Sequence, residues 1–223
     1  MTKEFFNKKM YLSGRTEEIF MAYRNIVFDM GNVLIEWNPQ NIVARFTDDK
    51  DKIEKISKAL FEIPEWGKLD EGTISEEEVL NIAKSKLPEE YYDDLEEVFD
   101  NWHYCLPIIS ETSNLVKILH SMGYGVYLLS NACKRFSELK KDIHCIKFMN
   151  GYMVSSYEKC CKPSKEIYQK FFDKFDLNPS ECLFIDDLEA NCDGARAVGM
   201  DAYRYDGDFE KLVEYLKSQG INL

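Results

Sequence analysis

A short apolar run over residues 182–185 ends directly in two adjacent carboxylates, Asp186 and Asp187. The same arrangement occurs much earlier, where residues 25–28 lead into Asp29 and a turn containing Gly31. Short apolar runs bounded by turn residues predict buried strands, so each carboxylate is expected at the carboxyl end of a strand. Clustered like charges are costly without a cation. Two such strand ends could share one metal ion and one anion.

Short apolar runs alternate with amphipathic stretches from residue 24 onward, which predicts an α/β fold with a Rossmann-like parallel sheet. In such sheets, ligands bind beyond the carboxyl ends of the strands. Between about residues 38 and 107 the pattern is helical instead, and Ser75 with Glu78 has the form of a capping box. We therefore expect an α/β hydrolase core of residues 1–37 and 108–223, and an inserted helical cap of residues 38–107.

Charge and cysteine usage narrow the class of partner and the compartment. The formal net charge of −12 argues against long contacts with nucleic acid. The seven cysteines are odd in number and lack C-x-x-C spacing, which favours reduced thiols in a cytoplasmic protein. No apolar segment has the length of a signal peptide or a membrane span, so we expect a soluble protein with no membrane partner. The oligomeric state is not predictable from the sequence.

Polar residues that could carry chemistry share one position, the end of an expected strand or the loop behind it. They are Asp29, Ser130, Asn131, Lys162, Asp186 and Asp187. Each alone is weak evidence, because Asp and Asn favour turns and a lysine before proline is usually exposed. It is the ordered set that points to a common site.

In this order the residues resemble the four motifs of the haloacid dehalogenase-like hydrolase superfamily. The motifs are Phe28-Asp29-Met30-Gly31-Asn32-Val33-Leu34, Leu129-Ser130-Asn131, Cys161-Lys162-Pro163 and Phe184-Ile185-Asp186-Asp187. The resemblance covers about residues 24 to 220, and a subgroup of the superfamily inserts a helical cap where this chain has its helical block. The first motif, Phe-Asp-x-Gly-Asn-Val, resembles that of a subgroup that contains sugar-phosphate phosphatases, including ones acting on glucose-1-phosphate.

The resemblance implies a Mg²⁺-dependent phosphatase that hydrolyses a small phosphorylated metabolite, such as a sugar phosphate. Asp29 would be the nucleophile and form an aspartyl-phosphate that water hydrolyses. The resemblance assigns the metal to Asp29, the main-chain carbonyl of Gly31 and Asp187, with Asp186 as a nearby carboxylate.

The same resemblance assigns the phosphate-binding groups. The Ser130 hydroxyl and the backbone N–H of Asn131 would bind phosphate oxygens. Lys162 would place its charge between the phosphate and Asp29, as a catalytic and a substrate-binding residue.

Gly31 departs from the family pattern, which has a second aspartate at that position. That aspartate is the usual acid/base, a role worth about 10²- to 10⁴-fold in rate. The preferred interpretation is a phosphatase for esters whose leaving groups need little protonation, namely sugar-1-phosphates, acyl phosphates or aryl phosphates. The first alternative is a non-catalytic module that binds a phospho-ligand or a protein. The second, ranked lower, is a metal-independent 2-haloacid dehalogenase, in which Asp186 and Asp187 would be an unneeded cluster.

Other residues are given no catalytic role. We expect residues 66–73 to form a turn that reaches the site or a plain loop with Trp66 packed in the cap. His103 is expected to be a packed or surface residue, and Asn191 a helix-surface amide. The acidic run over residues 89–97 is expected to be the solvated face of a helix. Nothing in residues 1–23 indicates a role.

Overall fold

The computed structural model describes residues 23–223 and contains a five-stranded, all-parallel sheet in the order β3-β2-β1-β4-β5. The expected α/β parallel fold is thereby confirmed. The part of the expected core that precedes residue 23 lies outside the described residues. The strands are β1 (Asn25–Phe28), β2 (Gly125–Ser130), β3 (Gly151–Val154), β4 (Cys182–Asp186) and β5 (Asp201–Arg204).

The central strand β1 pairs with β2 on one side and with β4 on the other. The chain adds β2 and β3 in one direction, then returns to place β4 on the opposite side of β1. This reversal of direction is the topological switch point, where open α/β sheets bind ligands. Because Phe28 is in register with Ile185, Asp29 and Asp186 emerge at the same level of the sheet edge.

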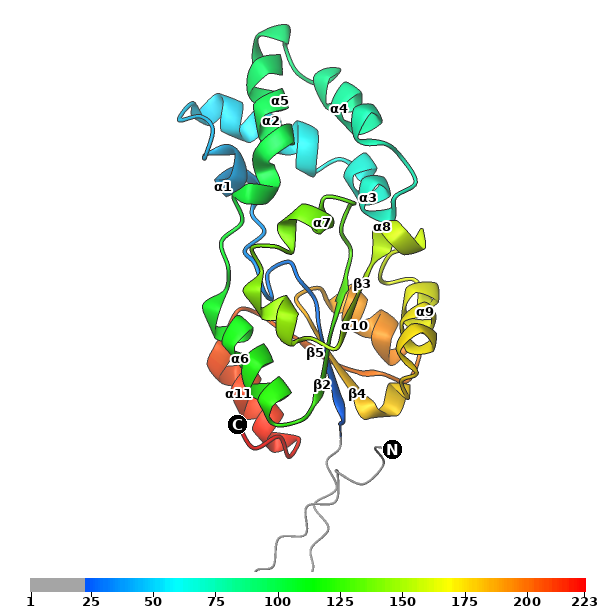
Figure 1. Cartoon of the computed structure of the whole chain (residues 1–223). Coiled ribbons are helices and arrows are strands. Elements are labelled where there is room, and N and C mark those ends of the chain that lie inside the picture. Colours follow the sequence, from blue (N-terminus) through cyan, green and yellow to red (C-terminus); the bar gives the residue numbers. More distant parts are fainter. Residues whose placement is uncertain (1–22) are drawn as a thin grey trace, which may run out of the picture.

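Helices cover both faces of the sheet (Figure 1). On one side lie α6 (Ser110–Ser121) and α11 (Phe209–Ser218), and on the other α9 (Lys165–Phe175) and α10 (Glu189–Arg196). Alternate strand residues point to opposite faces, so Ile26 and Phe28 belong to one buried cluster and Val27 to the other. The two packed faces fix the sheet rigidly and leave its carboxyl edge for the site.

The residues between β1 and α6 contribute helices but no strand of the sheet. In Figure 1 these helices lie beyond the carboxyl ends of the strands. The capping box forms, since Ser75 N donates to Glu78 Oε2 over 2.7 Å and Glu78 N donates to Ser75 Oγ over 3.2 Å. The helical block consists of α1 (Pro39–Val43), α2 (Lys50–Phe61), α3 (Pro64–Glu71), α4 (Glu76–Lys84), η1 (Glu89–Tyr91), α5 (Tyr92–Asn101) and η2 (Trp102–Tyr104).

The expected turn or loop over residues 66–73 is wrong for most of its length. Residues 64–71 form helix α3, which begins at Pro64, a favourable first-turn residue. Gly67 is tolerated inside the helix, and Gly72 ends it in the left-handed conformation with φ 73°. The segment therefore presents a rigid helix end to the cavity rather than a loop tip.

The two connections to the helical block run side by side. Ile35 and Ile108 form an antiparallel bridge. Glu36 N donates to Pro107 O over 2.8 Å, and Ile109 N donates to Leu34 O over 2.9 Å. The chain thus leaves and re-enters the α/β part at one place. Treating the block as a separate cap domain over residues 38–107 stays a prediction.

The remaining elements are short. Between β2 and α9 they are α7 (Phe136–Leu139), η3 (His144–Phe148), β3 and α8 (Ser155–Glu158). A last 3₁₀ turn, η4 (Pro179–Glu181), precedes β4.

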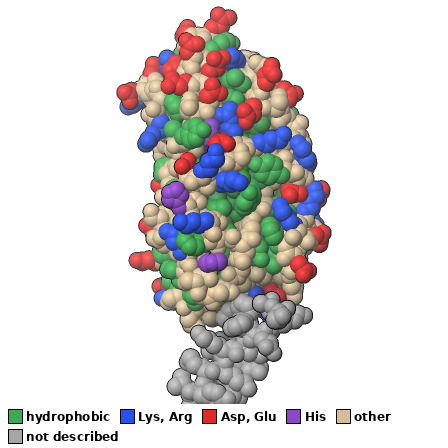
Figure 2. Space-filling view, in the orientation of Figure 1, with side chains coloured by type: hydrophobic (Ala, Val, Ile, Leu, Met, Phe, Trp, Pro, Cys, Tyr) green, Lys and Arg blue, Asp and Glu red, His purple; other side chains and the backbone are tan. Residues whose placement is uncertain are grey.

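The distribution of acidic side chains and the state of the cysteines agree with what the sequence predicts. Acidic side chains gather over the helical block, at the top of Figure 2. Most residues of the run 89–97 are exposed on η1 and α5, as expected for a solvated face. All seven cysteines carry free thiols. Within residues 23–223, no helix is long and apolar enough to cross a membrane.

Candidate active site

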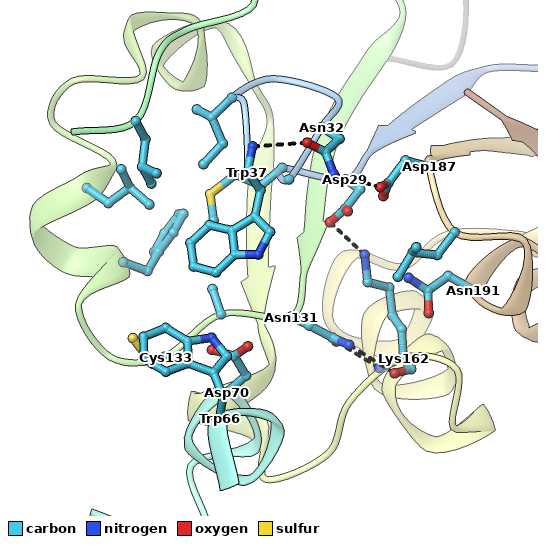
Figure 3. Close-up of a pocket in the computed structure, with 18 of the residues that line it drawn as sticks. Asp29, Asn32, Trp37, Trp66, Asp70, Asn131, Cys133, Lys162, Asp187 and Asn191 are labelled. Atoms are coloured by element: carbon cyan, nitrogen blue, oxygen red, sulfur yellow. Dashed lines mark hydrogen bonds and ion pairs between the residues drawn. The ribbon is translucent and has the colours of Figure 1, made fainter. Parts of the chain in front are cut away.

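A cavity of about 300 Å³ opens between the carboxyl ends of the strands and the helical block (Figure 3). This volume lies at the lower end of the range for small-molecule sites. Polar side chains from the strand ends line one part of it and aromatic side chains line the other. Its walls include Asp29, Gly31, Asn32, Trp37, Trp66, Asp70, Trp102, Asn131, Cys133, Phe136, Leu139, Lys162, Asp187 and Asn191.

Lys162 is the centre of the polar wall. Its Nζ donates to Asp29 Oδ1 (2.6 Å), Asp186 Oδ2 (2.7 Å) and the Leu129 carbonyl (2.9 Å), and its side chain is 1% exposed. Burial acts to lower the pKa of this ammonium, but the charges of Asp29 and Asp186 outweigh it and raise the pKa. A lysine before proline, which sequence statistics place on the surface, is here a buried, charged and fully bonded group.

Asn131 holds the Lys162 backbone in place. Its Oδ1 accepts from Lys162 N over 2.8 Å, and its Nδ2 donates to Lys162 O over 2.9 Å. The loop after β2 is thereby fixed to the segment before α9. Asn131 lines the cavity as expected, and its side chain also has a structural task that the sequence did not reveal.

Asp29 follows β1, and its backbone N donates to the Ile185 carbonyl over 2.8 Å. This bond fixes the residue directly beside the end of β4. Burial raises the pKa of the Asp29 carboxyl, while the nearby Lys162 ammonium works against the rise. Lys162 therefore favours the carboxylate form, the form that can act as a nucleophile.

Asp186 is saturated by protein donors. It is 0% exposed and accepts from Lys162, from the Leu188 backbone N (2.8 Å) and from Asn191 Nδ2 (3.0 Å to each oxygen). Its side chain supports Lys162 rather than facing a ligand. The expected surface position of Asn191 is wrong, because this amide is buried on the first turn of α10. The sequence did contain a signal for this burial, because Asn191 lies one helical turn after Asp186 and Asp187.

Asp187 is half-buried and lines the cavity. Burial raises its pKa, and Asn32 Nδ2 donates to its Oδ2 over 3.0 Å. Asn32 adopts a left-handed conformation with φ 51°, and its Oδ1 accepts from Trp37 N over 3.0 Å. The turn after β1 is thus bonded to the end of β4, which brings the two expected metal-binding segments together.

Carboxylate oxygens of Asp29, Asp186 and Asp187 lie within 4.8 Å of one another. An all-oxygen cluster of this kind fits Mg²⁺, which usually binds one or two carboxylates and keeps several waters. Because the oxygens of Asp186 are already bonded, Asp29 and Asp187 are the carboxylates that would hold the ion. Gly31 lines the same part of the cavity.

Ser130 lies at the end of β2 and is buried. Its hydroxyl is 3.5 Å from the Asn131 carbonyl, and the residue does not belong to the cavity wall. Its expected contact with a phosphate oxygen stays a prediction. His103 is likewise buried outside the cavity wall, and burial lowers its pKa.

The second wall is aromatic. Trp37, Phe61, Trp66 and Trp102 pack against one another with ring centroids 4.7 to 6.3 Å apart. Trp66 and Trp102 come from the helical block, and Trp37 lies on the connection to it. The two block tryptophans and Trp37 line the cavity, together with Phe136 and Leu139. Sequence reasoning did not anticipate this wall, because its members are far apart in the chain.

One carboxylate, Asp70, belongs to the aromatic wall. It lies in the last turn of α3, on the cavity wall that also includes Cys133. Burial raises the pKa of this carboxyl to about 7. No cap residue was expected to have a chemical role.

Comparisons with known proteins agree with the motifs. Residues 23–199 match the haloacid dehalogenase-like hydrolase family. A sesquiterpene phosphatase of Aspergillus oryzae is 27% identical over 182 residues, 80% of this chain and 88% of that protein. A D-ribitol-5-phosphate phosphatase of Bacteroides thetaiotaomicron is 27% identical over 202 residues, 81% of this chain and 91% of that protein.

Solved structures show the same fold. A haloacid dehalogenase family enzyme from Bacteroides thetaiotaomicron, in complex with magnesium and inorganic phosphate, is similar with a TM-score of 0.65 at 22% identity, covering 85% of this chain and 98% of that one. L-2-haloacid dehalogenase from Xanthobacter autotrophicus is similar with a TM-score of 0.63 at 16% identity, covering 90% and 84%. At these identities the likeness extends to the fold alone.

Proposed function

The chain belongs to the haloacid dehalogenase-like hydrolase family, and we propose that it is a Mg²⁺-dependent phosphatase acting on a small phosphorylated metabolite through an aspartyl-phosphate. The observation that carries the proposal is the buried bridge from Lys162 to Asp29 and Asp186, with Asp187 on the same cavity wall. A fixed cation beside a strand-end carboxylate prepares a place for a phosphate next to a nucleophile.

In the proposed reaction, the Asp29 oxygen that is not bonded to Lys162 attacks phosphorus. The bond from phosphorus to the leaving oxygen breaks, and an aspartyl-phosphate forms on Asp29. Water then attacks this phosphorus and releases phosphate and the Asp29 carboxylate. Lys162 orients Asp29 and offsets its charge, and Asn131 and Ser130 bind phosphate oxygens. Mg²⁺, held by Asp29, Asp187 and the Gly31 carbonyl, would neutralise phosphate charge.

Two leaving groups are supported by different observations. The relative that acts on D-ribitol-5-phosphate supports a sugar phosphate, as the resemblance implied. The relative named as a sesquiterpene phosphatase supports an apolar alcohol, and so does the wall of Trp37, Trp66 and Trp102. A sugar hydroxyl left without a partner on that wall would cost about 1–3 kcal/mol. We favour an aryl or apolar alkyl phosphate for this reason.

The deciding experiment is phosphate release from a panel of sugar, aryl and prenyl phosphates, with Mg²⁺ and with EDTA. We expect Mg²⁺-dependent release that Asp29→Asn reduces by about 10⁴-fold or more. Asp142→Asn is the matched control, because Asp142 is an exposed aspartate away from the cavity. Release unaffected by Asp29→Asn would contradict the proposal.

The same experiment separates the alternatives. A non-catalytic binding module, suggested by Gly31, would be stabilised thermally by phosphate with Mg²⁺ yet release no phosphate over long incubation. A haloacid dehalogenase would free halide from a 2-haloacid in EDTA. A cytoplasmic location is also proposed, supported by the seven free thiols.

A further inference from the structure

The proposed phosphatase has no acid/base beside its nucleophile. Gly31 offers no side chain, yet a departing alkoxide needs a proton and the attacking water must lose one. A Cβ at Gly31 would have Trp37 Cβ as its nearest contact, at the ordinary distance of 3.8 Å. If the proposed function is correct, another group of this chain must give a proton to the leaving alkoxide and take one from the attacking water.

The ionisable residues of the described cavity wall are Asp29, Asp70, Cys133, Lys162 and Asp187. Asp29 and Lys162 are bonded to each other, and Asp187 is bonded to the turn after β1. Burial raises the pKa of the Cys133 thiol to about 12, too high for proton exchange near neutral pH. Asp70 is the remaining group on this wall.

Asp70 is held rigidly between the helical block and the sheet. Its backbone carbonyl accepts from Ser155 Oγ over 2.5 Å, and Ser155 Oγ in turn accepts from the backbone N of Ala132, in the loop after β2, over 2.9 Å. Cys133 lies in the loop after β2, two residues beyond Asn131, so this loop contacts both Asp70 and the Lys162 segment. In Figure 3 the Asp70 carboxylate lies beside Trp66 and Cys133 and contributes to the same cavity as Asp29.

The surroundings of Asp70 favour its neutral form. Desolvation is the largest cause of its raised pKa of about 7, and the negative charge of Asp29 adds to it. The thiols of Cys133 and Cys161 also interact electrostatically with it. Two charged groups near α3 have partners of their own. Lys159, directly after α8, donates to the Gly72 carbonyl, and Glu76 of α4 is paired with Arg135. A carboxyl in this setting exchanges its proton at neutral pH.

We propose that Asp70, a residue of the helical block, is the general acid and base of this phosphatase, replacing the side chain that Gly31 lacks. As the Asp29 oxygen bonds to phosphorus, the bond to the leaving oxygen breaks, and its electron pair takes the proton from the Asp70 carboxyl. The Asp70 carboxylate then takes a proton from the water that attacks the aspartyl-phosphate. Phosphate leaves, Asp29 regains its carboxylate, and Asp70 is protonated again.

The test compares Asp70→Asn with the wild type on two esters. For an alkyl phosphate such as a prenyl phosphate, whose leaving group needs a proton, we expect kcat/KM to fall by about 10²- to 10⁴-fold. For p-nitrophenyl phosphate, whose leaving group departs as an anion, kcat/KM should change by less than about tenfold. Glu71→Gln is the matched control, since Glu71 is the next carboxylate on the same helix and lies outside the cavity wall.

A pH profile gives a second readout. Because the acid form of Asp70 is required, wild-type kcat/KM for the alkyl ester should fall as pH rises through about 7. The Asp70→Asn variant should lack that decline. Gly31→Asp placed in the Asp70→Asn background should restore part of the alkyl-ester activity, because the space beside Gly31 accepts a Cβ.

Equal losses on both esters, with no change in the pH profile, would mean that Asp70 only holds the helical block in place, and would overturn the inference. Undiminished alkyl-ester turnover would overturn it as well. Binding of inorganic phosphate with Mg²⁺ by each variant shows that the site has folded. Failure of the proposed function looks different, because no ester would then be hydrolysed in an Asp29-dependent way.

Discussion

The two walls of the cavity are built on opposite principles. On the sheet side, Lys162, Asp186, Asn191 and Asn131 use their polar groups on one another, and the hydrogen bonds fix every position. On the helical side, aromatic rings pack by shape, and a single carboxylate, Asp70, lies among them. The first wall is therefore a rigid polar one, fixed by hydrogen bonds, and the second an apolar one, formed by the packing of rings.

The two walls suit different parts of a phosphate ester. Rigid polar groups suit a phosphate, whose charge and shape are the same in every ester. An apolar wall suits the leaving group, the part that differs between substrates. If the division is correct, changes on the sheet side should affect folding and all substrates alike. Changes on the helical side should depend on the substrate or on pH.

The largest effect is expected for Lys162→Met. Removing the ammonium leaves Asp29 and Asp186 buried without their shared cation. Breaking a buried ion pair on one side costs about 3–5 kcal/mol, so we expect the urea unfolding free energy to fall by that amount. Lys58→Met, which removes the exposed ion pair of Lys58 with Glu54, should change the unfolding free energy far less, because water screens that pair. Similar losses in the two variants would contradict the rigid-wall interpretation.

An intermediate effect is expected from the titration of Asp70. Its pKa in the folded protein, about 7, lies above its value in an unfolded chain, so the folded state binds this proton more tightly. The resulting stabilisation is complete below about pH 4 and is lost as pH rises through about 7. Asp70→Asn should therefore lessen the loss of unfolding free energy between pH 5 and pH 8 by about 1–2 kcal/mol.

Urea titrations at the two pH values measure this difference directly. Asp142→Asn, at an exposed site, should leave the wild-type pH dependence unchanged. An identical pH dependence in wild type and Asp70→Asn would show that Asp70 is ionised in the folded protein at pH 5.

The smallest effect is expected for Trp66→Phe. The smaller ring leaves space on the apolar wall, so KM for a prenyl phosphate should rise about five- to tenfold, while KM for a small alkyl phosphate stays within about twofold. Phe99→Leu is the control, because Phe99 is buried in the helical block but does not line the cavity. Equal KM changes for both esters would argue against a leaving-group wall.

The sheet-side wall was largely readable from the sequence, and the helical wall was not. Asp29, Lys162 and Asp187 follow strand ends, and the periodicity of a buried sheet says where those ends meet. The resemblance separated Asp187, as a metal ligand, from Asp186, as a nearby carboxylate, and the packing gives the physical reason, since Asp186 is saturated by protein donors while Asp187 faces the cavity. Which residues of α3 face the cavity depends on contacts between segments far apart in the chain. Asp70 therefore could not be distinguished from the neighbouring acidic residues in the sequence.

The paired connections at Ile35 and Ile108 have an evolutionary consequence. Because the helical block leaves and returns at one point, it can be lengthened, recombined or replaced without shifting the register of the five strands. Such an exchange would bring a new aromatic wall, and with it a new residue in place of Asp70. Substrate range and the proposed proton transfer would then change together, because both depend on the same inserted piece of chain.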